Sequence, residues 1–323
     1  MNKVFTDYRR RRGNYNLKAT ERSLYSLCRS RVRDGLVPIS KILPEVHEQI
    51  QIAVNMRGIT GLTTGLHDLD HAIMGLNNSD LILIASRPGM GKTSLALNIA
   101  LNATKASQKT VAFFSLEMSC EQLTVRLLSS ESCIDSKKLH TGRRLKPEEW
   151  CSLAEATKSL SATNILINDD ESVAVSDMNA QCRRIPNLGL VIIDYIQLVQ
   201  SASSSGRHGS KNKSRVVSEI SRKMKSMAKE LNVPIICLSQ LPHTIDSRQH
   251  KKPMLSDFRN YGSIEKYFDI IIGLYRDFYY NTECENPDIA ECIILKNRRG
   301  ETGTVELKWQ PEYTTFSSLE KIL

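Results

Sequence analysis

One eight-residue segment constrains the fold of this 323-residue chain more than any other. It spans residues 86–93, reads SRPGMGKT, follows the apolar run Leu81–Ala85 and precedes a helical pattern over Thr93–Ala106. A glycine-rich turn between a strand and a helix directs backbone N–H groups at phosphate groups, at the positive end of the helix. We therefore predict a phosphate-binding loop in which Lys92 reaches the β- and γ-phosphates of a nucleotide and the Thr93 hydroxyl binds Mg²⁺.

The sequence around this loop alternates between strand and helix patterns. A helical pattern near Cys120–Leu128 and helices between the later strands predict an α/β fold with a mainly parallel sheet. At the end of the chain, two runs around a turn at Arg299-Gly300 predict an antiparallel hairpin. The expected parallel strands are Leu81–Ala85, Thr110–Ser115, Ile165–Ile167, Leu190–Ile193, Ile235–Ser239 and Asp269–Leu274, and the hairpin strands are Glu291–Lys296 and Gly303–Trp309.

Two carboxylates follow these strands at positions suited to nucleotide chemistry. Asp194 ends an apolar strand, and the parallel sheet would bring it to the edge beside the phosphate loop, where it can hold Mg²⁺. The alternative is an aspartate that caps a turn. Glu117 follows the strand after the loop's helix and can orient and deprotonate a water molecule, although it could equally be a charge at a helix N-terminus.

Composition and charge exclude several classes of protein. A hydrophobic fraction of 41% and a charged fraction of 24% are ordinary for a globular protein, and since no run of 18 apolar residues occurs, we expect no membrane partner. The net charge is +9, and residues 1–35 carry +7 of it, from ten Lys/Arg and three Asp/Glu. Arg9–Arg12 could therefore bind nucleic acid or an acidic surface, or be a solvated leader.

The eight cysteines form no C-x-x-C pair, which favours reduced thiols.

Three segments lie outside the strand and helix alternation. Residues 1–38 are charged and weakly periodic, which predicts a poorly packed arm. Ile39–Met56 has an apolar stripe typical of a short amphipathic helix, which packs either on its own domain or on a neighbouring subunit. Ser201–Arg215 is rich in serine, glycine and basic residues, which predicts a mobile loop.

Taken together, these motifs resemble the C-terminal motor domain of the DnaB family of replicative helicases. The resemblance covers roughly Ile42–Phe316. Its motifs are GITGLTTGLHDLD (58–70), FFSLEMS (113–119), VIIDYIQL (191–198), SEISRKMKSMAKELNVPII (218–236), LSQL (238–241), PMLSDFR (253–259), GSIE (262–265), LYRD (274–277), YYN (279–281) and KNRRGETGTV (296–305).

The resemblance implies a RecA-like P-loop core with a mainly parallel central sheet and a C-terminal antiparallel hairpin. It divides the chain into the arm 1–38, a linker helix 39–57 that docks on the adjacent subunit, and a RecA-like ATPase/helicase domain 58–323. It further implies a homo-hexameric ring that hydrolyses ATP with Mg²⁺ at subunit interfaces while it moves on single-stranded and forked DNA. A helicase loader and primase are further partners of the family.

The resemblance also assigns roles to residues. Lys92 and Glu117 keep the roles given above, Gln240 corresponds to a γ-phosphate sensor, and Lys296 and Arg298 correspond to cations that reach the neighbouring subunit's γ-phosphate. The nucleotide-binding set is Ser86, Arg87, Pro88, Gly89, Met90, Gly91, Lys92, Thr93, Ser94, Arg126 and Asp194, with Thr93 and Asp194 also the metal ligands. The DNA-binding set is Arg207, Lys211, Lys213, Arg215, Arg259, Asn260 and Gly262.

The sequence departs from the family pattern in two ways. Residues 1–38 are too few for the family's N-terminal helical domain, which binds primase and loader. Positions near the DNA-contacting layer also differ, namely Val216, His243, Asn260, 266–268 and Arg299. We therefore expect a helicase motor in the cytoplasm of a bacterial or phage-infected cell, with the plastid stroma as another location. The alternatives are a recombinase-type filament ATPase and a truncated ATP- and DNA-binding module without productive unwinding.

Overall fold

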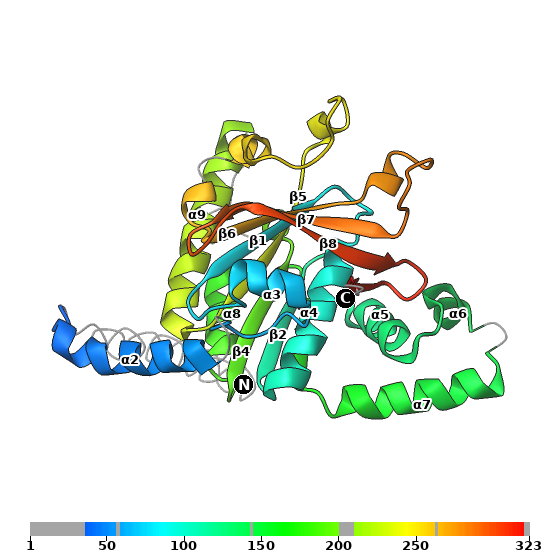
Figure 1. Cartoon of the computed structure of the whole chain (residues 1–323), viewed down its shortest axis with the longest axis horizontal. Coiled ribbons are helices and arrows are strands. Elements are labelled where there is room, and N and C mark those ends of the chain that lie inside the picture. Colours follow the sequence, from blue (N-terminus) through cyan, green and yellow to red (C-terminus); the bar gives the residue numbers. More distant parts are fainter. Residues whose placement is uncertain (1–35, 56–58, 143–144, 200–209, 262–263, 320–323) are drawn as a thin grey trace, which may run out of the picture. The chain divides into compact units, whose positions relative to one another are not determined.

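The computed structural model describes residues 36–55, 59–142, 145–199, 210–261 and 264–319 (Figure 1). The predicted arm lies largely outside these residues. The chain divides into two compact units, Met1–Asn55 and Met56–Leu323. In the first unit, helix α2 spans Ile39–Asn55 and has exposed apolar side chains along it. These are Ile39, Ile42, Leu43, Val46, Ile50 and Val54.

The second unit is built on a nine-stranded sheet in the order β3-β2-β4-β5-β1-β6-β7-β8-β9. The first six strands of this order, β3-β2-β4-β5-β1-β6, pair in parallel. Strands β7, β8 and β9 continue the sheet, and each pairs antiparallel with the strand before it. The predicted fold class is therefore confirmed. The strands are β1 Leu81–Ser86, β2 Thr110–Ser115, β3 Ile165–Asn168, β4 Leu188–Asp194, β5 Ile235–Gln240, β6 Ile270–Tyr275, β7 Ile289–Asn297, β8 Gly303–Gln310 and β9 Thr315–Ser318.

Helices cover both faces of this sheet. The α-helices of the unit are α3 His67–Ile73, α4 Lys92–Ser107, α5 Cys120–Ser132, α6 Ser136–Thr141, α7 Pro147–Ser161, α8 Val175–Cys182 and α9 Ser210–Leu231. Short 3-10 turns are η1 Ile196–Leu198, η2 His243–Ile245, η3 Leu255–Tyr261, η4 Ile264–Lys266 and η5 Asp277–Tyr279.

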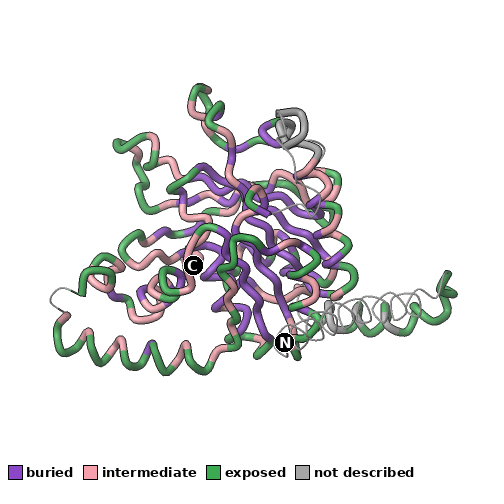
Figure 2. The backbone as a smooth tube through the Cα atoms, turned by 180° about the vertical axis from the view of Figure 1, so that it is seen from behind, coloured by how far each residue is buried: buried purple, intermediate pink, exposed green. Residues whose placement is uncertain are grey.

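The central strand β1 is buried along its whole length because it contributes side chains to the core on both faces. Ile82 and Ile84 belong to the apolar cluster that contains α4, while Leu81 and Leu83 belong to the cluster that contains Ile220 of α9. Figure 2 shows this buried centre as the purple strands. A continuous apolar strand packed on both sides is typical of parallel sheets, and it gives the segments at its two ends a rigid support.

Two sequence expectations about the connections are wrong. Of the segment Ser201–Arg215, which was expected to be a mobile loop, residues 201–209 lie outside the described residues, whereas residues 210–215 form the start of α9. Lysine and arginine are good helix formers, and a helix anchored by a buried apolar stripe extends into polar sequence at little cost. Between β5 and β6 the structure contains 3-10 turns where an α-helix was expected, because Pro242 and Pro253 interrupt that segment.

Candidate active site

The phosphate-binding loop joins the end of β1 to the start of α4. Gly89 and Gly91 have φ angles of +78° and +97°, the left-handed region that favours glycine. A Cβ atom on Gly91 would lie 2.9 Å from Cζ of Phe316, a contact that real Cβ atoms do not make. The two glycines are therefore required by both backbone conformation and packing, and they bring the loop directly into the N-terminus of α4.

Three predicted side chains meet at this helix end. The Thr93 hydroxyl donates to Oδ2 of Asp194 across 2.6 Å, and Nζ of Lys92 lies 3.4 Å from Oδ1 of the same carboxylate. Asp194 is fully buried and the Lys92 side chain is 11% exposed, so the two charges compensate each other where neither is well hydrated. Nζ of Lys92 also lies 5.0 Å from the centre of the Tyr195 ring.

Glu117 and Arg126 lie around the same carboxylate. Ser115 of β2 pairs with Asp194 of β4, and the backbone N–H of Leu116 donates to the Asp194 carbonyl across 2.6 Å. Glu117 therefore emerges at this sheet edge, with an exposed side chain. Burial lowers the pKa of Arg126, whereas the carboxylates of Asp194 and Glu117 favour its charged form. Arg126 is thus within electrostatic reach of both acidic residues.

Gln240 reaches the loop from the neighbouring strand. It ends β5 and pairs with Ser86, the first residue of the loop. Its backbone carbonyl accepts from the side-chain amide of Gln197 across 2.9 Å, and the same amide donates to Ser239. Gln197 was missed as a site residue, although it lies within the motif VIIDYIQL.

Arg87, which was predicted to bind the nucleotide, has a side chain that contacts the segment after β5 in its own subunit. Its side chain is 8% exposed and binds both carboxylate oxygens of Asp246, with Nε 3.1 Å from each and Nη2 2.7 Å from one. It also donates to the Leu241 carbonyl across 2.7 Å. The side chain of Arg87 therefore fastens the loop to the segment after β5. Among the other loop residues, Pro88 and Gly89 are exposed and Met90 and Ser94 are buried.

Arg276 is a further contact of the loop that sequence reasoning missed. Its Nη1 donates to the Gly89 carbonyl across 3.2 Å, and its guanidinium lies 5.0 Å from the centre of the Trp309 ring. Burial lowers its pKa. The motif LYRD carried the signal for this residue, but nothing in the sequence brings positions 89 and 276 together.

The donor atoms at the loop fit Mg²⁺. A hydroxyl from Thr93 and a carboxylate from Asp194 are the oxygen ligands that this ion prefers, and it usually retains several waters and binds substrate phosphates beside one or two protein ligands. Within the described residues no group of three or more His, Cys, Asp or Glu side chains could hold a metal ion.

The predicted cation pair lies elsewhere in the subunit. Lys296 donates to the carbonyls of Glu265 and Phe268, across 2.5 Å and 2.8 Å, and Arg298 binds Oδ1 of Asp269 across 3.0 Å. Burial, followed by the charge of Arg298, lowers the pKa of Lys296.

These contacts fix the pair at the start of β1. The backbone N–H of Asp269 donates to the Leu81 carbonyl across 2.8 Å, and Leu81 begins β1 while Ser86 at its other end begins the phosphate loop. At about 3.3 Å per residue, the two ends of the strand are about 17 Å apart. Arg298 therefore lies at the opposite edge of the sheet from its own subunit's loop.

The predicted DNA-binding residues divide into two groups. Lys211, Lys213 and Arg215 lie in the first turns of α9, and Arg259 and Asn260 lie in η3. Arg207 and Gly262 lie outside the described residues. Next to η3, the guanidinium of Arg248 binds both oxygens of Asp257 across 2.9 Å and 3.1 Å, which joins that turn to the segment after β5.

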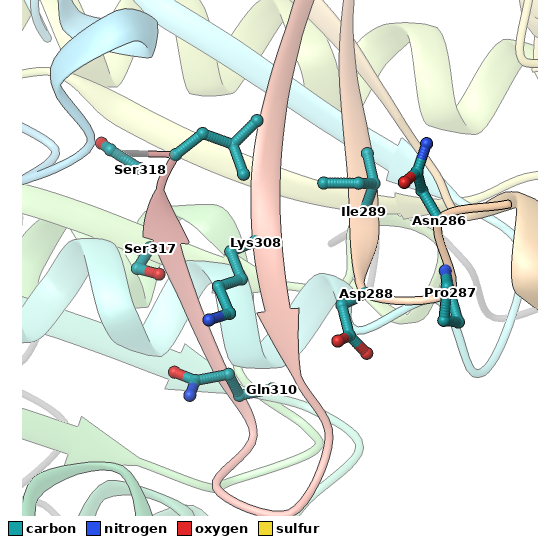
Figure 3. A pocket seen from close by; sticks show the side chains of 9 residues that line it. Asn286, Pro287, Asp288, Ile289, Lys308, Gln310, Ser317 and Ser318 are labelled. Carbon is teal, nitrogen blue, oxygen red and sulfur yellow. The ribbon is translucent and has the colours of Figure 1, made fainter. Parts of the chain in front are cut away.

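A cavity of about 460 Å³ lies beside β8 and β9, the last two strands in the sheet order (Figure 3). It is lined by residues 286–289, Lys308, Gln310 and 317–319. None of these residues belongs to the predicted sets.

In the part of the chain that the structure describes, no helix is both long and apolar enough to cross a membrane.

A phosphate loop at the end of a central parallel strand, with a buried aspartate at the end of a nearby strand, defines a P-loop ATPase with a RecA-like core. Residues 61–318 match the family described as the DnaB-like helicase C terminal domain. The chain therefore belongs to the DnaB-like family of replicative, ATP-dependent DNA helicases, as its motifs predict.

Individual relatives agree with this assignment. The chain is 44% identical over 309 residues to the replicative DNA helicase DnaB of Geobacillus stearothermophilus, covering 94% of this chain and 67% of the relative. It is similar to a solved ATPase domain with a TM-score of 0.82 and 37% identity, covering 88% of this chain and all of that domain. A solved DnaB-like replicative helicase, described with its interactions with primase, has a TM-score of 0.78 and 35% identity and covers 98% of this chain and 76% of that chain.

Proposed function

We propose that the chain is a ring-forming motor that hydrolyses ATP with Mg²⁺ at sites shared between subunits and moves on single-stranded DNA to unwind a duplex. One observation carries this proposal: Arg298 lies at the start of β1, about 17 Å along the strand from the loop that contains Lys92. A cation at that edge is badly placed for its own subunit's nucleotide and well placed for a neighbour's.

The residues of one subunit would bind the triphosphate. The loop N–H groups and Lys92 would balance the phosphate charge, and Thr93 and Asp194 would hold Mg²⁺, which would supply further positive charge to stabilise the transferring phosphoryl group. The exposed carboxylate of Glu117 would orient and deprotonate the attacking water. Gln240, adjacent to Ser86 in the sheet, would sense the γ-phosphate.

The neighbouring subunit would complete the site. Arg298 has a 48% exposed side chain, so its guanidinium can contact a second subunit, where it would stabilise the charge of the transferring phosphoryl group as an arginine finger does. Lys296 donates to two carbonyls of its own subunit, which supports a role in holding the hairpin and the segment 265–268 together as well as its proposed role at the neighbour's phosphate.

Helix α2 supports assembly into a ring. Its exposed apolar side chains include Leu43, Val46 and Ile50, with exposed fractions of 50%, 41% and 54%. An apolar stripe of this kind is stabilised when it packs against another surface, and we propose that residues 39–57 dock as a linker helix on the adjacent subunit of a hexamer.

We propose DNA contacts at the start of α9 and in η3. Lys211, Lys213 and Arg215 lie within five residues of one another on the helix, which supports a sequence-independent grip on phosphates. Primase and a helicase loader are proposed partners on the basis of the relatives, and their direct test is a binding assay. The bacterial relatives support a cytoplasmic location.

The decisive experiment is to measure ATP hydrolysis with and without single-stranded DNA, together with strand separation of a forked duplex. We expect hydrolysis to be stimulated by DNA and the fork to be unwound. Hydrolysis that ignores DNA, with no unwinding by an assembled ring, would instead favour a binding module without motor activity. Filaments rather than rings in electron micrographs would favour a recombinase-type ATPase.

A further inference from the structure

The buried carboxylate of Asp269 organises the edge of the sheet where Arg298 lies. Its Oδ1 accepts from Arg298 across 3.0 Å, and its Oδ2 accepts from the backbone N–H of Leu81 across 2.8 Å and from Nζ of Lys225. The Asp269 side chain is 7% exposed. Every one of these contacts is inside the subunit, so the carboxylate is fixed to β1 on one side and to α9 on the other.

The guanidinium of Arg298 makes two hydrogen bonds within its own subunit, and its side chain is also partly exposed to solvent. Its Nη1 binds Asp269, and its Nη2 donates to the Lys266 carbonyl across 2.6 Å. A guanidinium has five N–H donors in a rigid plane, so these two bonds set the direction of the plane. About half of the side chain is exposed, so part of it is accessible to a neighbouring subunit.

We infer that Asp269 is a positioning residue for the arginine finger: it fixes the Arg298 guanidinium in the orientation in which it meets the neighbouring subunit's γ-phosphate. This inference rests on the proposed function, since it requires Arg298 to act on a neighbour's nucleotide. Preorganised charges stabilise a transition state without reorganising during the reaction, and a guanidinium on a freely rotating side chain would lose that advantage. Asp269 is hydrogen-bonded to the backbone of Leu81. It therefore fixes the arginine finger relative to β1, the strand that carries its own subunit's phosphate loop.

Asparagine cannot replace Asp269 in this role. The carboxylate accepts on both oxygens, whereas a carboxamide has one acceptor oxygen and one donor group. Asp269→Asn therefore loses either the bond to Arg298 or the anchor to Leu81 and Lys225. Asp269→Glu keeps the charge but displaces it by one methylene, so it tests orientation with a smaller effect on the buried charges.

The next residue of the hairpin provides a matched control. Arg299 binds the buried carboxylate of Asp80 through Nε and Nη2, across 3.1 Å and 3.0 Å. The Arg299 and Asp80 side chains are 46% and 5% exposed, close to the 48% and 7% of the Arg298 and Asp269 pair. Asp80→Asn removes an ion pair of the same kind at the same edge without touching Arg298.

The experiment compares kcat, nucleotide affinity and thermal stability in the assembled protein for Asp269→Asn, Asp269→Glu, Asp80→Asn, Arg298→Ala and the double variant Asp269→Asn/Arg298→Ala. We expect both Asp269 variants to lower kcat on the order of 10- to 100-fold, the scale for a displaced reacting group, with nucleotide affinity unchanged. We expect the double variant to turn over no more slowly than Arg298→Ala, because both changes act through one guanidinium. Asp80→Asn should keep its kcat even if it lowers stability.

Two results would overturn the inference. One is a kcat for Asp269→Glu equal to that of the original protein, and the other is a double variant in which the two losses multiply. If Arg298→Ala itself keeps full turnover, the proposed shared site fails first, which is a separate outcome from the failure of Asp269 as its positioning residue.

Discussion

Thr93 donates its hydroxyl to Asp194 across 2.6 Å, which joins the first turn of α4 to the end of β4. Nζ of Lys92 lies 3.4 Å from the other oxygen of the same carboxylate. The residues that would hold a nucleotide's phosphates and its metal ion are therefore in mutual contact, and each depends on the charge of the others.

Lys92→Ala should weaken nucleotide binding by about 10- to 100-fold, the loss expected when a hydrogen bond to a charged group worth about 1.5–3 kcal/mol is removed. The phosphate charge and the buried Asp194 both lose their cation in this variant. Titration with a fluorescent ATP analogue measures the change. Lys105→Ala is the control. Lys105 lies in the last turn of the same helix, far along it from Lys92, and pairs with Glu131. Equal affinities in the two variants would contradict the assignment of Lys92.

Arg298→Ala should retain nucleotide binding and lose turnover by a factor on the order of 10³, the scale reported for an arginine finger. The reason is that the guanidinium would act only when charge develops during phosphoryl transfer. Steady-state hydrolysis together with nucleotide titration separates the two effects. Arg299→Ala is the matched control on the adjacent residue, and a variant of Arg298 that loses binding along with turnover would point to a structural role.

Replacing Lys211, Lys213 and Arg215 by alanine should weaken single-stranded DNA binding and flatten its dependence on salt. Each phosphate contact contributes about 0.7 to the slope of log K against log salt concentration for a single strand, so loss of all three should reduce the slope by about 2. Fluorescence anisotropy at several salt concentrations measures this slope. Lys223→Ala lies on the same helix, where Lys223 pairs with Glu219, and it should leave the slope unchanged. An unaltered slope in the triple variant would remove α9 from the DNA contacts.

Asp246 should make the stability of the protein sensitive to acid. Hydrogen bonds from Tyr280 and then Arg87 lower its pKa below the ordinary value of 3.8. A carboxyl group with a lowered pKa in the folded state contributes stability that is present above its ordinary pKa and is lost as the pH falls through the folded value. Thermal unfolding between pH 6 and pH 2.5 should therefore show a smaller acid-induced loss in Asp246→Asn than in the original protein. Tyr280→Phe, which removes the largest cause, should give an intermediate profile, and identical profiles in all three proteins would refute this account of Asp246.

The elements that could be predicted from the sequence are those with strong local patterns. The apolar run before residues 86–93 and the glycine-rich turn identify β1 and α4, and alternation of strands and helices identifies the parallel sheet. Strand β9 was not predicted because its four residues, Thr315–Ser318, contain a single large apolar side chain, Phe316. That side chain packs beneath Gly91, a contact across more than 200 positions for which a local pattern gives no sign.

The candidate site also has a part that local sequence predicts and a part that depends on contacts between distant residues. The types and spacing of Lys92, Thr93 and Asp194 indicate their chemistry without a structure. The direction of a side chain depends instead on distant partners, as with Arg87, which was assigned to the nucleotide but binds Asp246. Asp269 was missed as well, because an aspartate at the start of a strand has no distinctive pattern and its meaning comes from Arg298, Lys225 and Leu81 around it.

The central claim is that each hydrolytic site takes its phosphate loop from one subunit and its arginine from the next. Mixing Lys92→Ala and Arg298→Ala subunits tests this claim most directly, because a heterologous ring interface pairs the loop of one protomer with the hairpin of another. In random equal mixtures about a quarter of the interfaces combine an intact loop with an intact arginine, so ATP hydrolysis should rise well above that of either variant alone. Activity in the mixture equal to the average of the two separate variants would contradict a shared site.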